Sequence, residues 1–416
     1  MKLKKLVTVM AVAGITLPGA AMATNGMFSS GYGMVANGMG GAATAMSEDA
    51  FGGANNPASM VFVGDRIDFG ASLFSPRREA SNAGGAFGNV VSESDSNYFA
   101  IPEFGYNKMM NPNLSLGVSV YGNGGMNTDY PALSGMGTTN ILGGSGSLGV
   151  DLMQLIVAPT AAFKITPNHS IGISPLLGYQ RFKAQGLQGF TAISTDPTHV
   201  TNNGYDDAFG AGVRVGYMGK ITPQLTIGLA YSSKVDMQKM KKYAGLFAEQ
   251  GNLDLPENYD AGVAYKFTPD LTVALDYQRI NYSGVAAIGN ASIANLANGL
   301  GSNNGSGFGW HDIDVWKLGA EYKYNKNWIM RAGWNHGDNP VQSADVTFNI
   351  LAPGVIKDHL TMGTTYTTST GGELTVAYTH GFENSVSGPR PAAFGGGTDT
   401  IRMHQDILGI AYGWKM

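Results

Sequence analysis

After about residue 65 the chain shows a residue-by-residue alternation of apolar with small or polar side chains. The clearest stretches are 114–120, 225–232, 271–278 and 316–324. Side chains of a β-strand point to opposite faces in turn, so each stretch would have one apolar face and one small or polar face. No later stretch reaches the roughly 18 consecutive apolar residues of a membrane-spanning helix. The alternation therefore predicts an all-β protein.

The segments between these stretches fall into two classes. Three short ones, 164–168, 220–224 and 266–270, are near copies of a Lys-x-Thr-Pro-x turn, and 111–113, 325–327 and 370–372 are short as well. Proline, asparagine and glycine at these sites end strands. The others are long and irregular: 75–96, 122–150, 183–206, 236–256, 282–312, 339–355 and 383–400. Short turns at one edge and long loops at the other are typical of outer-membrane barrels, and the spacing predicts about 14 antiparallel strands over residues 65–416.

A soluble, secreted all-β protein is the other class that shows such alternation. Charged residues make up only 13% of the chain, against about 25% in ordinary soluble domains. The last strand, 408–416, alternates up to the final residue, Met416. Such terminal strands serve as recognition signals for the barrel-assembly machinery, so we expect that machinery as a partner during biogenesis. These features favour the barrel.

The first 23 residues have the pattern of a secretory signal peptide. Lys2, Lys4 and Lys5 precede a short apolar run, and Ala21-Met22-Ala23 forms a small-x-small cleavage pattern,. We expect Thr24 to begin the mature chain. Without the three lysines, 23 basic residues face 30 acidic ones, which argues against nucleic acid as a partner. The chain has no cysteine, so it has neither disulfides nor thiolate metal sites.

Residues 24–64 do not alternate. They are small and glycine-rich, and before Asp65 they carry only the charges of Glu48 and Asp49. Such a segment is poorly suited to a surface domain. It could fill a barrel whose lumen is too wide for wall side chains to close, and we expect it to form an N-terminal plug, or hatch.

The motifs of this segment resemble those of the FadL family of outer-membrane transporters for long-chain fatty acids and aromatic hydrocarbons. They are Asn25-Gly26, Gly31-Tyr32-Gly33, Gly40-Gly41-Ala42 and Asn56-Pro57-Ala58. Further matches are 253–256, 261–265 and 357–363, so the resemblance covers essentially the whole mature chain. The glycine-rich opening and 121–126 are more similar to the toluene-channel branch of the family.

The resemblance implies a 14-stranded barrel plugged by the hatch, in the outer membrane of a Gram-negative bacterium. A ligand would land among the extracellular loops, pass to a pocket beside the mature N-terminus, and leave through a lateral gap near the third strand. It would need no energy source. Asn56, Pro57 and Ala58 match the hatch motif, Met27 and Phe28 match the pocket by position, and Gly122, Gly124 and Gly125, just after the third strand, are assigned to the gap.

Apolar loop residues give the pocket further candidates: Leu133, Ile141, Leu142, Leu246 and Phe247. They either contact ligand or pack their own loops together. Arg214, Lys317 and Arg331 fall on the polar face of their strands, as do Asp276, Glu321 and Glu373. In a barrel that face is the lumen. These charges either brace the wall, or one of the three cations binds a ligand carboxylate.

The sequence therefore predicts passive uptake of fatty acids or aromatic hydrocarbons by a monomer in contact with outer-membrane lipid and lipopolysaccharide. Two alternatives stay open: an outer-membrane lipid hydrolase and a general porin. Neither a G-x-S-x-G elbow nor an H-E-x-x-H motif is present,. We expect no catalytic residue, no metal and no cofactor.

Overall fold

A computed structural model describes residues 25–46 and 48–416 of the chain. Its single sheet has 16 strands, of which β2 and β9 are short additions, and the other fourteen form a closed antiparallel barrel. The barrel closes where β1 pairs with β16, from Arg66 opposite Lys415 to Ala83 opposite Thr398. The predicted fold class is confirmed. The expected signal peptide and Thr24 lie outside the described residues.

The strands are β1 (Arg66–Gly85), β2 (Gly88–Glu93), β3 (Phe99–Asn111), β4 (Leu114–Tyr130), β5 (Leu148–Thr166), β6 (His169–Gln185), β7 (Asp206–Lys220), β8 (Leu225–Ser232), β9 (Asp236–Met237), β10 (Asn258–Lys266), β11 (Leu271–Ile280), β12 (Ile313–Lys323), β13 (Trp328–Gly337), β14 (Asp358–Thr367), β15 (Gly372–Pro389) and β16 (Thr398–Lys415).

The described helices are all short. The α-helices are α2 (Met34–Gly38), α3 (Met60–Val63), α4 (Ala248–Gly251), α5 (Ala286–Gly289) and α6 (Val346–Asn349). The 3-10 helices are η1 (Pro57–Ser59), η2 (Gln188–Ile193), η3 (Pro197–His199), η4 (Lys241–Tyr243), η5 (Tyr282–Gly284), η6 (Leu296–Asn298), η7 (Ser343–Asp345) and η8 (Ala392–Phe394). None of the helices in the described part of the chain is long and apolar enough to cross a membrane.

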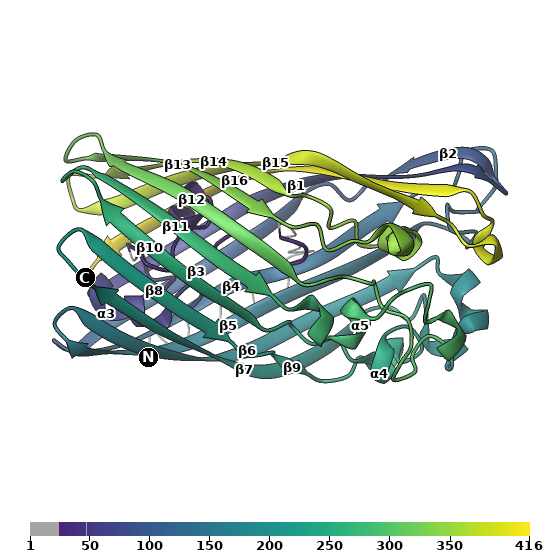
Figure 1. Ribbon diagram of the computed structural model, residues 1–416, viewed down its shortest axis with the longest axis horizontal. Helices are drawn as coiled ribbons and strands as arrows, with labels where there is room; N and C mark the ends of the chain where they lie inside the picture. Colours follow the sequence, from purple (N-terminus) through teal and green to yellow (C-terminus); the bar gives the residue numbers. More distant parts are fainter. Residues whose placement is uncertain (1–24, 47) are drawn as a thin grey trace.

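The two ends of the barrel differ as the connections predicted. All six short turns connect strands at the end that also holds the chain terminus of β16, and the long loops gather at the opposite end (Figure 1). In outer-membrane barrels the short turns are periplasmic and the long loops extracellular. The loop end is therefore the outer surface.

Several segments that we expected to be irregular are largely strand. Most of 75–96 belongs to β1 and to the hairpin that it forms with β2, and β4 and β15 also extend far into segments expected to be loops. The outer parts of these extensions reach toward the loop end (Figure 1), beyond the lipid, where nothing requires an apolar outer face. Their sequences accordingly lose the alternation while their backbones remain paired.

The outer face of the wall carries an apolar belt. Ile227, Val263, Leu275, Leu318 and Trp334 are successive register partners across β8 to β13, and all but Ile227 are more than 40% exposed in the isolated chain. An exposed belt of this kind fits contact with lipid chains. The inward neighbours are small or polar, and the predicted lumen charges Asp276, Glu321, Arg214, Lys317 and Arg331 are all buried inside the barrel.

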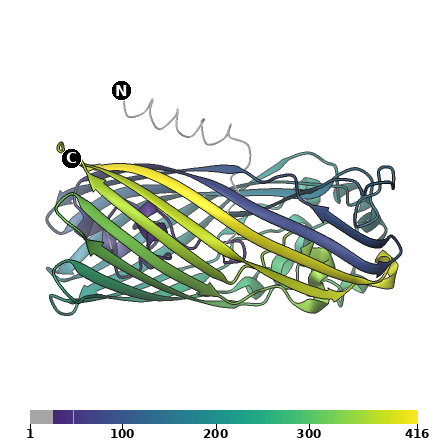
Figure 2. The ribbon, with the colours of Figure 1, turned by 90° about the horizontal axis from the view of Figure 1, so that it is seen from above.

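The described residues before β1 lie inside this wall. The purple segment in Figures 1 and 2 runs within the barrel. Helix α2 contacts β13 to β16, while η1 and α3 contact β3 to β7 on the other side. We call residues 25–46 and 48–63 the hatch. Because it touches most of the wall, it occupies the lumen that the strands alone leave open.

Candidate functional site

The Asn-Pro-Ala turn anchors the hatch to the wall. The Asn56 side chain is fully buried and donates to the carbonyl oxygens of Thr44, at 2.8 Å, and Tyr217, at 3.0 Å. Its Oδ1 accepts from the amide of Ala58 at 3.1 Å and so caps η1, which begins at Pro57. Asparagine is a favoured cap, and proline fits the first helical position because its missing N–H has no partner there.

The turn fits against the wall because two glycines face it. Gly172 of β6 and Gly216 of β7 are register partners. A Cβ on Gly216 would lie 2.1 Å from Asn56 Oδ1, and one on Gly172 would lie 2.3 Å from the backbone of Pro57. Any side chain at either position would displace the turn.

The same arrangement occurs twice more. Gly228 of β8 and Gly262 of β10 are register partners, and both face Thr44 of the hatch. Gly319 of β12 and Gly333 of β13 are also register partners, and they face hatch residues 39–40. Each pair forms a shallow inner saddle in which hatch backbone lies. Pairs of inward glycines on neighbouring strands therefore set where the hatch packs.

Wall charges bind the hatch through hydrogen bonds and ion pairs. Asp276 accepts from the amides of Ala43 and Thr44, both at 2.8 Å. Arg331 pairs with Glu321 of the wall at 2.9 Å and with Glu48 of the hatch at 2.7 Å. This is the bracing role that we considered for these charges, extended from the wall to the hatch.

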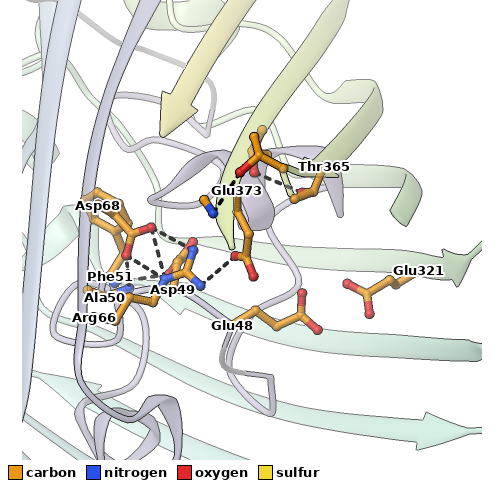
Figure 3. A network of polar contacts seen from close by, with 12 residues as sticks. Glu48, Asp49, Ala50, Phe51, Arg66, Asp68, Glu321, Thr365 and Glu373 are labelled. Atoms are coloured by element: carbon orange, nitrogen blue, oxygen red, sulfur yellow. Dashed lines mark hydrogen bonds and ion pairs between the residues drawn. The ribbon is translucent and has the colours of Figure 1, made fainter. Parts of the chain in front are cut away.

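A second network holds the hatch near the periplasmic end. Arg66 pairs with Asp68 and with Glu373, and Asp68 also accepts from the amide of Ala50 at 2.9 Å (Figure 3). Asp49 of the hatch lies beside this group. Burial, followed by the nearby negative charge of Asp68, raises the pKa of Asp49 to about 7, against the attraction of Arg66,.

Arg214 and Lys317 line a small polar cavity together with Tyr32 and Asp260. Arg214 donates to the Ser232 hydroxyl at 2.5 Å, and Lys317 lies 3.9 Å from Asp260. The structure therefore places all three predicted carboxylate partners, Arg331 included, beside protein groups. That one of them binds a ligand carboxylate stays a prediction.

The glycines assigned to the lateral gap lie in the third barrel strand, and our placement of them just after it is corrected. Strand β4 continues to Tyr130 because its outer half remains paired with β5. Gly122 and Gly124 pair with Leu155 and Gln154, which are consecutive on β5, so Asn123 is an extra residue in a β-bulge,.

The pairing of β4 with its other neighbour stops at this bulge. The β3–β4 ladder ends at Phe104 opposite Val120, although β3 starts five residues earlier, at Phe99. From inside the barrel Phe28 bridges to Gly124, and the Ser29 amide donates to the Asn123 carbonyl at 3.4 Å. The start of the hatch therefore meets the wall where its ladder is interrupted.

A small cavity lies beside the start of the hatch, lined by Gly26, Phe74, Met126, Trp310 and Met403 among others. Tyr282 fixes the hatch next to it: its hydroxyl donates to the Asn25 carbonyl and accepts from the Met27 amide at 2.9 Å. Burial raises the pKa of Tyr282, so this hydroxyl stays protonated and able to donate. We call this space the hatch cavity.

A second, small and strongly apolar cavity lies among the extracellular loops. Phe182, Leu246, Phe247, Phe308 and Leu351 are among its lining residues, so two of the predicted pocket residues line it. We call it the loop cavity. Leu133, Ile141 and Leu142 are buried in the surrounding apolar core but do not line either cavity.

Sequence reasoning missed Tyr282 and Trp310, whose ring centroids lie 5.0 Å apart. Both lie at the ends of the expected loop 282–312, and large aromatic residues beside such a loop were the available signal.

A closed antiparallel barrel with a lipid-facing belt, a filled lumen and apolar cavities on the extracellular side of the plug defines a plugged outer-membrane transport protein. A family model described as "Outer membrane protein transport protein (OMPP1/FadL/TodX)" matches residues 9–393. The chain belongs to this family and is located in the outer membrane, as the resemblance predicted.

Solved structures share the fold at low sequence identity. The toluene transporter TodX of Pseudomonas putida is 18% identical, with a TM-score of 0.71, over 93% of this chain and 99% of that one. A FadL homologue of Pseudomonas aeruginosa is 15% identical, with a TM-score of 0.72 over 94% and 99%. The toluene transporter TbuX of Ralstonia pickettii is 18% identical, with a TM-score of 0.65 over 93% and 99%. No curated protein sequence matches the chain.

Proposed function

We propose that this chain carries hydrophobic small molecules, fatty acids or aromatic hydrocarbons, passively across the outer membrane. The ligand first binds in the loop cavity. It then moves to the hatch cavity beside Gly26, and leaves sideways between β3 and β4 at the bulge of Asn123. Displacement of the first hatch residues from the bulge opens this exit.

The positions of the two cavities support the first part of this route. Leu351 lines the loop cavity, and its neighbour Ala352 lines the hatch cavity. Likewise, Phe308 lines the loop cavity and Trp310 lines the hatch cavity. The two spaces are thus separated by thin layers of side chains. A ligand could pass between them without entering water, which matters because an apolar ligand gains about 0.8 kcal/mol for each buried CH₂ group.

The interrupted β3–β4 ladder is the observation that carries the proposal. Unpaired backbone groups facing lipid are costly, so membrane barrels normally pair every strand throughout. Here the ladder stops at Val120, and Gly125, two residues beyond the bulge, lines the hatch cavity. An interruption of the wall ladder beside this cavity suits lateral release into the bilayer.

No observation favours the two alternatives. A general porin needs an open lumen, whereas the hatch occupies this one and is bound to the wall through Asp276, Arg331 and Asn56. A lipid hydrolase would need a nucleophile and a base placed together, and the arrangement described here is one of packing and anchoring.

Substitution of the first hatch residues tests the proposal. The double variant Met27→Ala, Phe28→Ala should bind toluene and oleate more weakly than the wild type, because it removes apolar contacts beside the hatch cavity. The barrel should remain folded, as judged by its heat-modifiable mobility in gels. Phe163→Ala is the matched control, since Phe163 faces lipid and is 48% exposed. Unchanged affinity in the double variant would contradict the proposal.

A further inference from the structure

The three Lys-x-Thr-Pro turns at the periplasmic end share a longer pattern that the transport route does not use. Each continues to a hydroxyl residue six positions after the lysine: Lys164 to Ser170, Lys220 to Thr226 and Lys266 to Thr272. The two residues of each pair are register partners across their hairpin. Each lysine follows a buried, inward residue by two positions and so lies on the inner face as well,. The pattern therefore places an ammonium group beside a hydroxyl group inside the barrel mouth.

Two of these pairs line a cavity of about 560 Å³ at the periplasmic end of the lumen. They are Lys220 with Thr226 and Lys266 with Thr272, and their hairpins are neighbours because β8 pairs with β10. The exposed turn 221–224 forms part of the lining, so the cavity opens toward the periplasm. Pockets for small molecules typically measure about 300–1,000 Å³. This cavity therefore has the size of a small-molecule site.

The side chains of these two pairs have no hydrogen-bond or ion-pair partner in the described part of the chain. In the first copy of the pattern the Ser170 hydroxyl donates to the Ala58 carbonyl of the hatch at 2.7 Å. The hydroxyls of Thr226 and Thr272 form no such bond in the described residues. The ion pairs that the described lysines form belong to other positions. The two pairs are therefore free to bind a ligand.

The cavity has an excess of positive charge. Glu48 is the one carboxylate among its described lining residues, and it already pairs with a wall arginine at 2.7 Å. A third lysine lies close by, since the Nζ atoms of Lys164 and Lys220 are 5.4 Å and 4.4 Å from the centroid of the Phe62 ring. Like charges held together repel each other. A bound anion would relieve this repulsion.

The lining favours a phosphate group as that anion. Lysine binds phosphate as a point charge, and hydroxyl groups donate to its remaining oxygens. A phosphate ester carries about two negative charges at neutral pH, which matches the two lysines. Polar groups form the larger part of the lining, with Asn168 and Gln224 among them, so a hydrocarbon would fit poorly. Because the barrel wall separates this site from the bilayer, the ligand must arrive in solution from the periplasm.

We propose that the two lysine–threonine pairs bind a soluble, phosphate-bearing small molecule from the periplasm. The opposite side of the cavity is formed by the hatch, through Ala45, Met46, Glu48 and Phe62. A molecule bound here contacts the wall and the hatch together, and so holds the hatch in place. It would therefore act as an inhibitory effector of transport. Only this last effect rests on the proposed function; the binding site does not.

Isothermal titration calorimetry tests the binding, with full-length protein in a non-ionic detergent and a phosphate-free buffer. The probes are pyrophosphate and glycerol 3-phosphate. Lys266→Met should weaken binding of both about tenfold or more, the loss expected for a charge-assisted hydrogen bond. Thr272→Val should weaken it less. Lys326→Met is the matched control, because Lys326 is an exposed lysine of another short turn at the same end and does not line the cavity.

Hydrogen exchange separates a ligand-binding lysine from a purely structural one. Pyrophosphate should increase the protection of hatch amides in the wild type and in Lys326→Met, but not in Lys266→Met. Without the anion, all three proteins should show the same protection. Lys266 suits this test better than Lys220, whose ammonium group also contacts the ring of Phe62 in the hatch.

Three results would overturn the proposal. The wild type could bind neither probe, or Lys266→Met could bind them as tightly as Lys326→Met does. In a second arm, phosphatidylglycerol is added to the micelles: binding of this lipid alone, without the soluble probes, would place the phosphate site on the lipid-facing side of the wall. Because no transported compound is present, none of these results bears on the transport proposal.

Discussion

At the scale of single residues, the inward glycines of the wall decide where the hatch can rest. Gly172 and Gly216 leave room for Asn56 and Pro57, and an added Cβ would come closer than atoms in proteins normally approach. The cost of a methyl group in such a packed place is about 1–3 kcal/mol. Because that cost falls on contacts between hatch and wall, it should loosen the hatch before it unfolds the barrel.

We therefore expect Gly216→Ala to reduce protection of the hatch amides against hydrogen exchange, with the wall amides unaffected. Its matched control is Gly284→Ala, because Gly284 lies in η5 and a Cβ there would meet nothing within 4 Å. Equal protection in the two variants would show that the glycine saddles do not position the hatch.

Among elements, the hatch is held by buried carboxylates, and this makes its docking sensitive to pH. Asp49 lies near Asp68, Glu48 and Glu103, all of them acidic, with Arg66 as the opposing cation. Its pKa is raised from 3.8 to about 7. Between these values the folded state binds more protons than the unfolded state, so the contribution of Asp49 to stability falls as pH rises from about 4 to about 7,.

The hatch should accordingly be better protected near pH 5 than near pH 8, after correction for the intrinsic pH dependence of exchange. In the variant Asp49→Asn, which mimics the protonated acid, the hatch amides should stay protected at both pH values. The amides of residues 43–55 report this most directly. If the wild type is equally protected at both values, or better at the higher one, the charge of Asp49 does not govern docking.

For the molecule as a whole, the sequence predicted the wall well and its interior only in part. The wall follows from local patterns: turns such as 220–224 end strands, and alternation places Leu275 outward and Asp276 inward. The glycine saddles need two strands in register, which a single segment does not reveal. The inward position of Arg78, which lines the hatch cavity, could not be predicted for the same reason, since only the register of β1 shows that Arg77 faces outward and Arg78 inward.

The sequence also did not predict the extensions of β1, β4 and β15 toward the loop end, for a physical reason. Residues 75–96 pair with neighbours outside the lipid, so their side chains carry no apolar alternation. The bulge of Asn123 gave no signal beyond its glycines. Its position depends on the pairing of β4 with β5, which is again a non-local property.

Deletion of Asn123 tests whether the ligand is released laterally through the bulge. The deletion removes the extra residue while keeping the β4–β5 register on both sides, so β4 can straighten and pair with β3. Asn123→Ala is the control, since it keeps the residue count.

The measurement is uptake of labelled oleate and toluene by cells that lack a channel of their own. We predict that the deletion variant folds and binds ligand but takes up neither compound, while Asn123→Ala transports like the wild type. Uptake by the deletion variant at the wild-type rate would show that the ligand leaves by another route.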